Sequence, residues 1–231
     1  MTDRLSKIIL ILLSMIGAYL IFLKVDWIHK GGPVMILIIF SSIFAFAIIL
    51  AKMRQFSQDS LDVENFLKNI FERMERQRIK EAIDLCDQTH TSLARILKAG
   101  IIKYDRPKDE IKEAMDDSFL YEIPLLEGNL SLLSTIVQIA PLLGFLGTVV
   151  GMIKIFGIIE AKAASVVPVV AGDLAPGIWE ALTCTAAGFL LAIPILIAHN
   201  YLVNRVKSLV DEMERGATEL LAFFMERRMS P

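Results

Sequence analysis

Four long stretches of this chain contain no charged residue: 8–23, 31–51, 128–153 and 181–202. A helix needs roughly 17–25 apolar residues to cross the hydrocarbon core of a bilayer. The last three stretches reach that length, and the first is slightly short. Because lipid offers no water to bond free peptide groups, a spanning stretch of this kind is helical. The sequence therefore predicts an all-α, polytopic membrane protein with three core transmembrane helices and an additional N-terminal hydrophobic helix.

Most charged residues fall in two polar segments, 52–127 and 204–231. Basic side chains follow the second and the last apolar stretches, at Lys52, Arg54, Arg205 and Lys207. Lys and Arg next to membrane helices stay on the cytoplasmic side, so we expect both polar segments in the cytoplasm. The connection at about 154–173 is then expected on the periplasmic side.

These boundaries divide the chain into five parts. We expect, in order, an N-terminal hydrophobic helix with a short periplasmic segment (1–33), a transmembrane helix (34–51), a cytoplasmic helical domain (52–127), a transmembrane helix pair (128–203) and a cytoplasmic helical tail (204–231). The stretch at 8–23 has the basic flank and apolar length of a secretory signal but lacks a convincing small-x-small cleavage site. An uncleaved anchor or fourth span is favoured, and a cleaved signal peptide stays open.

The polar segments show helical periodicity. Apolar residues recur at steps of three and four, as is typical of an amphipathic helix, at Val63, Phe66, Leu67, Ile70, Phe71 and Met74. A weaker stripe runs from Ile79 to Gly100, with a break near 89–91. A third helix is expected after Pro107, continuing into the membrane with a bend at Pro124. The tail extends the last span in the same way.

Composition and motifs argue against several classes of function. A net charge of −2 and a pI near 6.0 give no electrostatic basis for binding nucleic acid. Cys86 and Cys184 fall in a polar and an apolar segment, so neither a disulfide nor a metal site is expected. The sequence shows no Gly-rich phosphate loop and no Ser/His/Asp set. We therefore expect no enzyme activity, no cofactor and no metal.

Glu180 lies inside the apolar run from Leu174 to Gly188, where we expect a membrane helix. A carboxylate at that depth costs at least a few kcal/mol, so it must face protein or water, and it can then exchange a proton. Two plainer explanations stay open. The carboxyl could be permanently protonated and only donate a hydrogen bond between helices, or it could lie shallow and hydrated near the outer surface.

Hydroxyl groups accompany Glu180 on the same helix. Helical spacing puts Thr183 on the face of Glu180 and turns Thr185 away from it. A lone threonine can bond the carbonyl one turn back, but threonines flanking a buried glutamate favour a polar track. Asp173 could relay protons toward Glu180, although a cap at the start of the helix is favoured.

The third apolar stretch carries a Gly147-x-x-x-Gly151 pair, and Gly144, Thr148 and Gly151 share one helix face. Small residues with this spacing let membrane helices approach closely. We therefore expect Gly144, Gly147 and Gly151 to pack against another helix or to line a narrow lumen.

Two segments, in this order, resemble the ExbB/TolQ proton-channel family, a more distant relative of the flagellar stator protein MotA. Residues 140–151 are similar to the family's A-P-x-x-G-x-x-G-T-V-x-G element, and residues 174–194 to its L-A-P-G-I-x-E-A-L-x-x-T-A-x-G-x-x-x-A-I-P element. The chain departs from the family in its extra N-terminal apolar stretch and in His199, which replaces an aromatic residue.

The resemblance implies a multi-pass protein of the bacterial inner membrane. In the family, a homo-oligomer, usually a pentamer, surrounds an ExbD/TolR-like single-span partner with an intramembrane Asp. The proton motive force then drives a TonB/TolA-like transducer for outer-membrane transport or envelope integrity. Glu180, Thr148 and Thr185 match the family's proton-pathway residues, and Thr183 and Asp173 are accessory candidates.

Another class of function stays open. A passive membrane scaffold that organises envelope proteins would use Glu180 only as a structural hydrogen-bonding group. A solute carrier is disfavoured, because the sequence shows no internal repeat. The sequence does not separate the ExbB, TolQ and motility branches.

Overall fold

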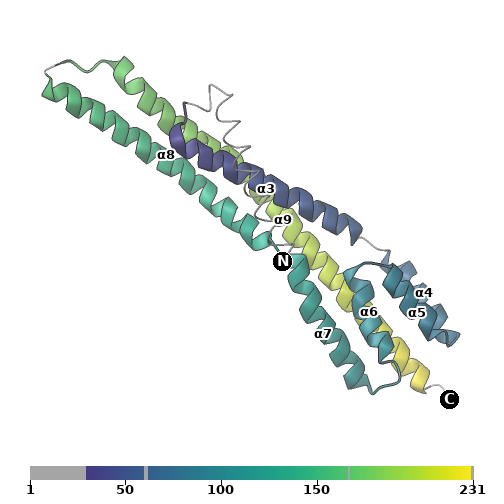
Figure 1. Cartoon of the computed structure of the whole chain (residues 1–231). Coiled ribbons are helices and arrows are strands. Elements are labelled where there is room, and N and C mark those ends of the chain that lie inside the picture. Colours follow the sequence, from purple (N-terminus) through teal and green to yellow (C-terminus); the bar gives the residue numbers. More distant parts are fainter. Residues whose placement is uncertain (1–29, 60–61, 166, 230–231) are drawn as a thin grey trace, which may run out of the picture. The chain divides into compact units, whose positions relative to one another are not determined.

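The computed structural model describes residues 30–59, 62–165 and 167–229 (Figure 1). The N-terminal stretch that we predicted as a signal anchor or signal peptide lies outside the described residues. The described part is built from helices alone: α3 (Gly32–Gln58), α4 (Val63–Glu75), α5 (Ile79–Gln88), α6 (Ser92–Ile102), α7 (Lys108–Glu127), α8 (Leu130–Ala164) and α9 (Ala171–Met229). The predicted all-α class is thus confirmed for the described residues.

Within the described residues, three helical stretches are long and apolar enough to cross a membrane. They are Gly32–Ser57, Lys108–Ala164 and Ala171–Arg227, and they contain the three core spans expected from the sequence. Large apolar side chains on these helices are exposed, including Leu142, Phe145, Leu182 and Leu190. Such a surface is unusual for a water-soluble chain and is typical of one that contacts lipid.

The described residues form two compact units. The apolar unit contains residues 30–50 and 129–200, and the polar unit contains residues 51–59, 62–128 and 201–229. The residues expected to handle protons all lie in the apolar unit.

The apolar unit is built from the first part of α3, from α8 and from the first part of α9. In Figure 1, α8 and the first part of α9 are joined by a short connection at one end. Helix α8 continues to Ala164, and α9 begins at Ala171. Residues 154–164, which hydropathy assigns to the connection between spans, are therefore helical.

The helix entering the third span is interrupted later than Pro124. Pro124 lies inside α7, and the break comes at Gly128 and Asn129, where Asn129 adopts a left-handed conformation with φ of 67°. Asn is one of the few residues that tolerates this region. The proline is accommodated within the helix, and the asparagine ends it.

The amphipathic stripes predicted for the polar segment form the core of the polar unit. Helix α4 buries Phe66, Leu67, Ile70 and Met74, and a break at residues 89–91 separates α5 from α6. Side chains cap two of these helices. Asp62 accepts a hydrogen bond from the Asn65 amide at 3.2 Å, and Thr91 accepts one from the Ala94 amide at 3.3 Å.

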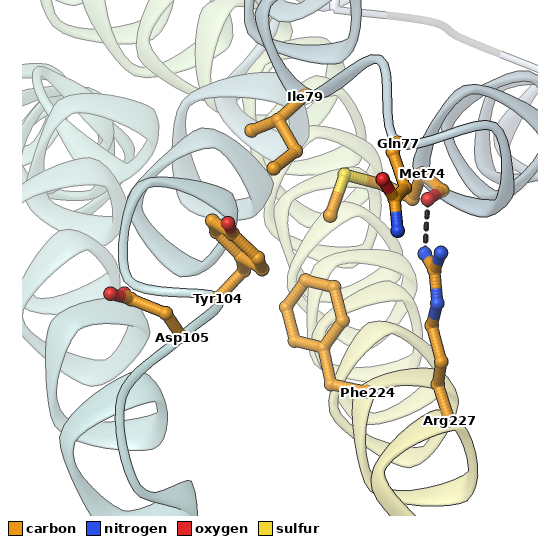
Figure 2. Close-up of a pocket in the computed structure, with 7 residues that line it drawn as sticks. All are labelled: Met74, Gln77, Ile79, Tyr104, Asp105, Phe224 and Arg227. Carbon is orange, nitrogen blue, oxygen red and sulfur yellow. Dashed lines mark hydrogen bonds between the residues drawn. The ribbon is translucent and has the colours of Figure 1, made fainter. Parts of the chain in front are cut away.

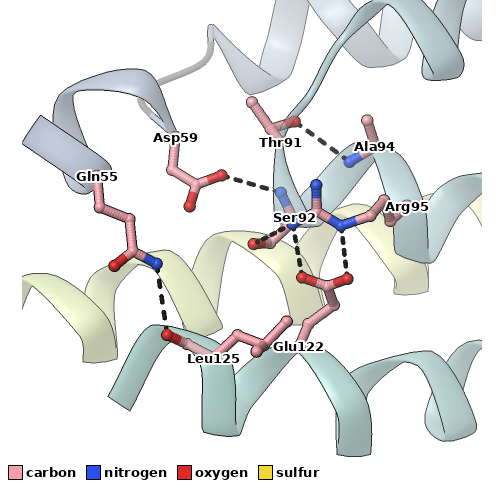
Figure 3. Close-up of polar contacts among 8 residues, drawn as sticks. All are labelled: Gln55, Asp59, Thr91, Ser92, Ala94, Arg95, Glu122 and Leu125. Carbon is pink, nitrogen blue, oxygen red and sulfur yellow. Dashed lines mark hydrogen bonds and ion pairs between the residues drawn. The ribbon is translucent and has the colours of Figure 1, made fainter. Parts of the chain in front are cut away.

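An ion pair with a buried carboxylate joins α6 to α7 in the polar unit (Figure 3). Arg95 donates to both carboxylate oxygens of Glu122, with Nε 2.5 Å and Nη2 2.7 Å away. The Glu122 side chain is 3% exposed, and that of Arg95 is 47% exposed. The hydrogen bonds to Glu122 raise the pKa of the Arg95 guanidinium. The pair fixes the register of the two helices.

A pocket of about 550 Å³ also lies in the polar unit (Figure 2). It is lined by Met74, Gln77, Ile79, Tyr104, Asp105, Phe224 and Arg227. The Arg227 guanidinium donates to the backbone carbonyls of Met74 and Glu75 at the end of α4. The arginine therefore caps the C-terminal end of α4, where the Met74 carbonyl also accepts the Gln77 amide at 3.1 Å.

Candidate functional site

Glycines bring α8 and α9 into close contact. A Cβ added at Gly147 would lie 2.2 Å from Cys184 Cβ, and one added at Gly151 would lie 2.6 Å from the Gly177 carbonyl oxygen. A Cβ at Gly144 would lie 3.2 Å from Thr185 Cα. All three glycines for which we expected a packing role thus face α9. Their missing side chains let the two backbones approach.

The residues of α9 that face these glycines also have small side chains. A Cβ added at Gly188 would lie 2.7 Å from the Ala140 carbonyl oxygen, and one at Gly177 would lie 3.0 Å from the Gly151 carbonyl oxygen. Between these two glycines, Ala181 and Cys184 are buried. We refer to this contact, formed by Ala140, Gly144, Gly147 and Gly151 of α8 and by Gly177, Ala181, Cys184 and Gly188 of α9, as the glycine seam.

Two threonine hydroxyls meet beside the glycine seam. Thr148 Oγ1 of α8 hydrogen-bonds Thr185 Oγ1 of α9. The Thr185 hydroxyl also lies 3.1 Å from the carbonyl oxygens of Gly144 and Ala181, and the Thr148 hydroxyl lies 3.3 Å from that of Ala181. Both side chains are half-buried. The two proton-pathway threonines predicted on different spans are therefore in direct contact.

Glu180 is buried and forms an ion pair across the helices. Its side chain is 8% exposed, and both of its oxygens accept hydrogen bonds from Lys154 Nζ, at 2.7 and 2.6 Å. A lysine ammonium can only donate, so the carboxylate here is an acceptor. The contact is an ion pair between a buried carboxylate and a half-exposed lysine, and both plainer explanations of Glu180 stay open.

The start of α3 closes the other side of Glu180. Gly32 has φ of +66°, and a Cβ added there would lie 1.9 Å from Glu180 Oε1. The Cys184 thiol, one turn after Glu180, donates to the Gly31 carbonyl oxygen at 2.8 Å. A side chain at position 32 would therefore overlap the carboxylate, and glycine leaves that space free.

Asp173 lies in the first turn of α9 and not ahead of it. Its carboxylate accepts a hydrogen bond from the Val170 amide at 2.9 Å, which is the return half of a capping box. It also pairs with Lys162 of α8. Asp173 thus has two local partners, and the structure does not bring it into contact with Glu180.

Thr183 is buried, 5% exposed, but it bonds neither Glu180 nor the threonine pair. The structure therefore separates the predicted residues into two adjacent groups: Thr148 with Thr185, and Glu180 with Lys154. In the described part of the chain, no cluster of His, Cys, Asp or Glu could hold a metal ion.

Lys154 is the residue that sequence reasoning missed. Because it ends the charge-free stretch 128–153, hydropathy assigns it to the connection outside the membrane. A signal for its role was nevertheless present. Lys154 follows Gly147 by seven residues and Gly151 by three, which puts it on the face of the helix that carries the glycines.

Comparison with known proteins identifies the family. The model of the MotA/TolQ/ExbB proton channel family matches residues 88–215, which is more than half of the chain. The chain belongs to this family. The matched segment contains both threonines of the pair, Glu180 and Lys154. Together with the long apolar helices, membership in the MotA/TolQ/ExbB family indicates a protein of the inner membrane.

Individual relatives match over most of the chain. The putative biopolymer transport protein ExbB-like 3 of Synechocystis sp. is 30% identical over 195 residues, covering 83% of this chain and 91% of the relative. The Tol-Pal system protein TolQ of Haemophilus influenzae is 27% identical over 190 residues, covering 78% and 82%. The putative biopolymer transport protein ExbB homolog of Methanothermobacter thermautotrophicus is 26% identical over 187 residues, covering 80% of this chain but only 65% of the relative.

Proposed function

We propose that this chain is an ExbB/TolQ-like proton-channel subunit of the inner membrane, and that it uses the proton motive force to drive a TonB/TolA-type transducer. The observation that carries the proposal is Glu180, a buried carboxylate in a membrane helix whose hydrogen-bonding partner comes from the neighbouring helix. An ionisable group is retained at that depth when it moves charge or ions.

The energetics are sufficient for such a role. One elementary charge crossing a potential of 100 mV releases about 2.3 kcal/mol. That amount shifts a two-state equilibrium by well over tenfold, enough to bias a packed interface. Glu180 would take up and release the proton, and the two threonine hydroxyls would offer donors and acceptors beside the pathway. The role is one of transport, with no enzymatic step.

The chain needs partners for this work. Glu180 is the one carboxylate in the apolar core of the described spans, so a second acidic group on the proton path has to come from another protein. An ExbD/TolR-like single-span partner with an intramembrane Asp would supply it. That partner would sit inside a homo-oligomer of this chain, a pentamer as in the family. Exposed apolar side chains such as Phe145 and Leu190 are available for subunit and lipid contacts.

The test is complementation of a strain that lacks this protein. Glu180→Ala and Glu180→Gln should abolish detergent resistance or energy-dependent uptake, whichever the deletion impairs, while membrane abundance and assembly stay normal. Glu160→Gln, which changes an exposed glutamate of α8, should complement fully. Thr148→Val should reduce activity without abolishing assembly. Full activity of Glu180→Gln would support the passive scaffold instead, because an amide still hydrogen-bonds but carries no exchangeable charge.

A further inference from the structure

The Glu180 pair is asymmetric in its exposure. The Glu180 side chain is 8% exposed, whereas that of Lys154 is 48% exposed. Within the described residues, Lys154 is the one side chain that hydrogen-bonds this carboxylate. A buried charge without its counter-charge is strongly unfavourable. The carboxylate therefore depends on the lysine far more than the lysine depends on the carboxylate.

Movement is possible on one side of the pair only. The backbone of Gly32 stands against Glu180 Oε1, and the glycine seam fixes α9 against α8 just beyond it. Lys154, in contrast, has a long flexible stem and a half-open surface. If the ion pair is broken, the lysine is the partner that moves away.

We infer that Lys154 is a positioning residue for Glu180, which holds the ionised carboxylate toward α8 and is released when Glu180 takes up a proton. The step is balanced: the carboxylate and one proton give a neutral carboxylic acid, and the ammonium keeps its own protons. Protonation removes the Coulomb attraction between the two groups. This inference rests on the proposed function, since it assumes that Glu180 exchanges protons.

In the part of the chain that the structure describes, few other charged or titratable groups face the carboxylate. From its own helix, the Cys184 thiol lies one turn away and bonds the Gly31 carbonyl oxygen. From α3, Gly32 stands beside the carboxylate, while Lys30, just before that helix, lies with Nζ 5.2 Å from the ring centroid of Trp179. From α8, Lys154 is the facing group. Among the described residues, Lys154 is therefore the charged side chain in direct contact with Glu180.

A second lysine pair provides a matched control. Lys162 of α8 pairs with Asp173 of α9, so it joins the same two helices by the same chemistry. Its partner, however, is 24% exposed and also accepts a backbone hydrogen bond. Lys162→Met should therefore leave Glu180 unaffected.

The first experiment measures the protonation of Glu180 directly. Infrared spectra of the full-length reconstituted protein at pH 7 are compared with those of Glu180→Gln, so that any carboxylic-acid carbonyl band lost in the variant belongs to Glu180. We expect no such band in the wild type, a clear band in Lys154→Met, and none in Lys154→Arg or Lys162→Met. A Lys154→Met spectrum equal to that of the wild type would overturn the inference.

The second experiment does not depend on the folding of Lys154→Met. Glu180→Gln imitates the protonated acid, so it should free Lys154 for acetylation by acetic anhydride, measured by mass spectrometry. Lys154 should react about tenfold faster than in the wild type, the order expected for the loss of one charge-assisted hydrogen bond. Lys162 is the internal reference and should not change. Equal rates at Lys154 in the two proteins would contradict the release step.

The complementation assay separates the two proposals. Lys154→Met should lower the transport-dependent phenotype, and Lys154→Arg should restore it. If Glu180→Gln complements fully while the infrared and labelling results are as expected, the proposed function fails and the ion pair is structural. If Glu180→Gln is inactive while Lys154→Met is unchanged in spectrum and activity, the inference about Lys154 alone fails.

Discussion

Lys154 and Glu180 join α8 to α9 through two hydrogen bonds, from one ammonium to both oxygens of one carboxylate, at 2.7 and 2.6 Å. The pair places a positive and a negative charge next to the glycine seam, within the apolar unit. Its two members differ in burial, and the backbone of α3 closes the side opposite the lysine. The surroundings of the pair lead to testable consequences beyond the two experiments on Glu180 and Lys154.

Gly32→Ala should destabilise the apolar unit and displace the Glu180 side chain. A non-glycine residue in the left-handed region costs about 1–2 kcal/mol, and the added Cβ would stand 1.9 Å from Glu180 Oε1. Thermal unfolding of the protein in detergent should therefore begin at a lower temperature. The control is Gly172→Ala, because a Cβ there meets nothing within 4 Å. Equal unfolding temperatures for Gly32→Ala and the wild type would show that the carboxylate is not confined there.

Gly147→Ala should loosen the contact between α8 and α9. The new methyl group would overlap Cys184, with Cβ atoms 2.2 Å apart, and overpacking of this kind costs about 1–3 kcal/mol. Gly157→Ala is the opposite case on the same helix, since a Cβ there meets nothing within 4 Å. It should be neutral or stabilise the helix by up to about 1 kcal/mol. Thermal unfolding of both variants measures the contrast, and destabilisation by Gly157→Ala alone would contradict the seam.

Arg95→Met should destabilise the polar unit, because it leaves the Glu122 carboxylate, 3% exposed, without its bidentate partner. Losing a charge-assisted pair of this kind costs about 2–3 kcal/mol. Arg215→Met is the control, since Arg215 and Glu219 form an exposed pair one turn apart on α9; it should cost less than about 0.5 kcal/mol. Chemical unfolding followed by circular dichroism distinguishes the two, and similar costs would mean that Glu122 finds other partners.

The Cys86 thiol should react slowly with iodoacetamide. Burial, and after it the neighbouring Asp87, raise the pKa of Cys86 to about 12, and Lys98 opposes them only in part. At pH 8 a thiol with that pKa is ionised in about one molecule in ten thousand, and only the thiolate reacts. The rate should keep rising with pH well above pH 9, where a free cysteine levels off.

The same shift makes stability depend on pH. Between about pH 8.5 and the raised pKa, the unfolded thiol loses its proton and the folded one keeps it, so the free energy of unfolding falls as pH rises.

Mass spectrometry of the peptide that contains Cys86 measures its labelling by iodoacetamide, and the urea-unfolded protein is the control. Fast labelling of the folded protein at pH 8 would show that the site opens.

Much of the fold could be predicted because its signals are local. The apolar stripe that includes Phe66 and Ile70 repeats with the period of a helix, and those side chains are buried in α4. Pro107 stands immediately before α7, where a proline is tolerated. The small residues of the third stretch predict close packing, and Gly144, Gly147 and Gly151 do face α9. In each case the prediction depends only on residues that are close together in the sequence.

The features that could not be predicted depend on contacts between distant residues. Hydropathy falls at Lys154, but the helix does not end there, because its backbone bonds are unaffected by the charge. The lack of room for a side chain at Gly32 comes from Glu180, 148 residues later in the sequence. The helix α7 ends at Glu127, just before Asn129, whose backbone adopts the left-handed region. In the sequence, Pro124 is the more obvious signal for a break, but it lies inside the helix.

The glycine seam limits how the membrane helices can move. Gly144, Gly147 and Gly151 lie against the backbone and small side chains of α9. If either helix turned about its axis, larger side chains such as leucine and phenylalanine would enter this contact, where there is no room for them. Interiors packed this tightly resist gradual deformation. We therefore expect α8 and the part of α9 that packs against it to move together, so that any sliding or rotation takes place on their outer faces.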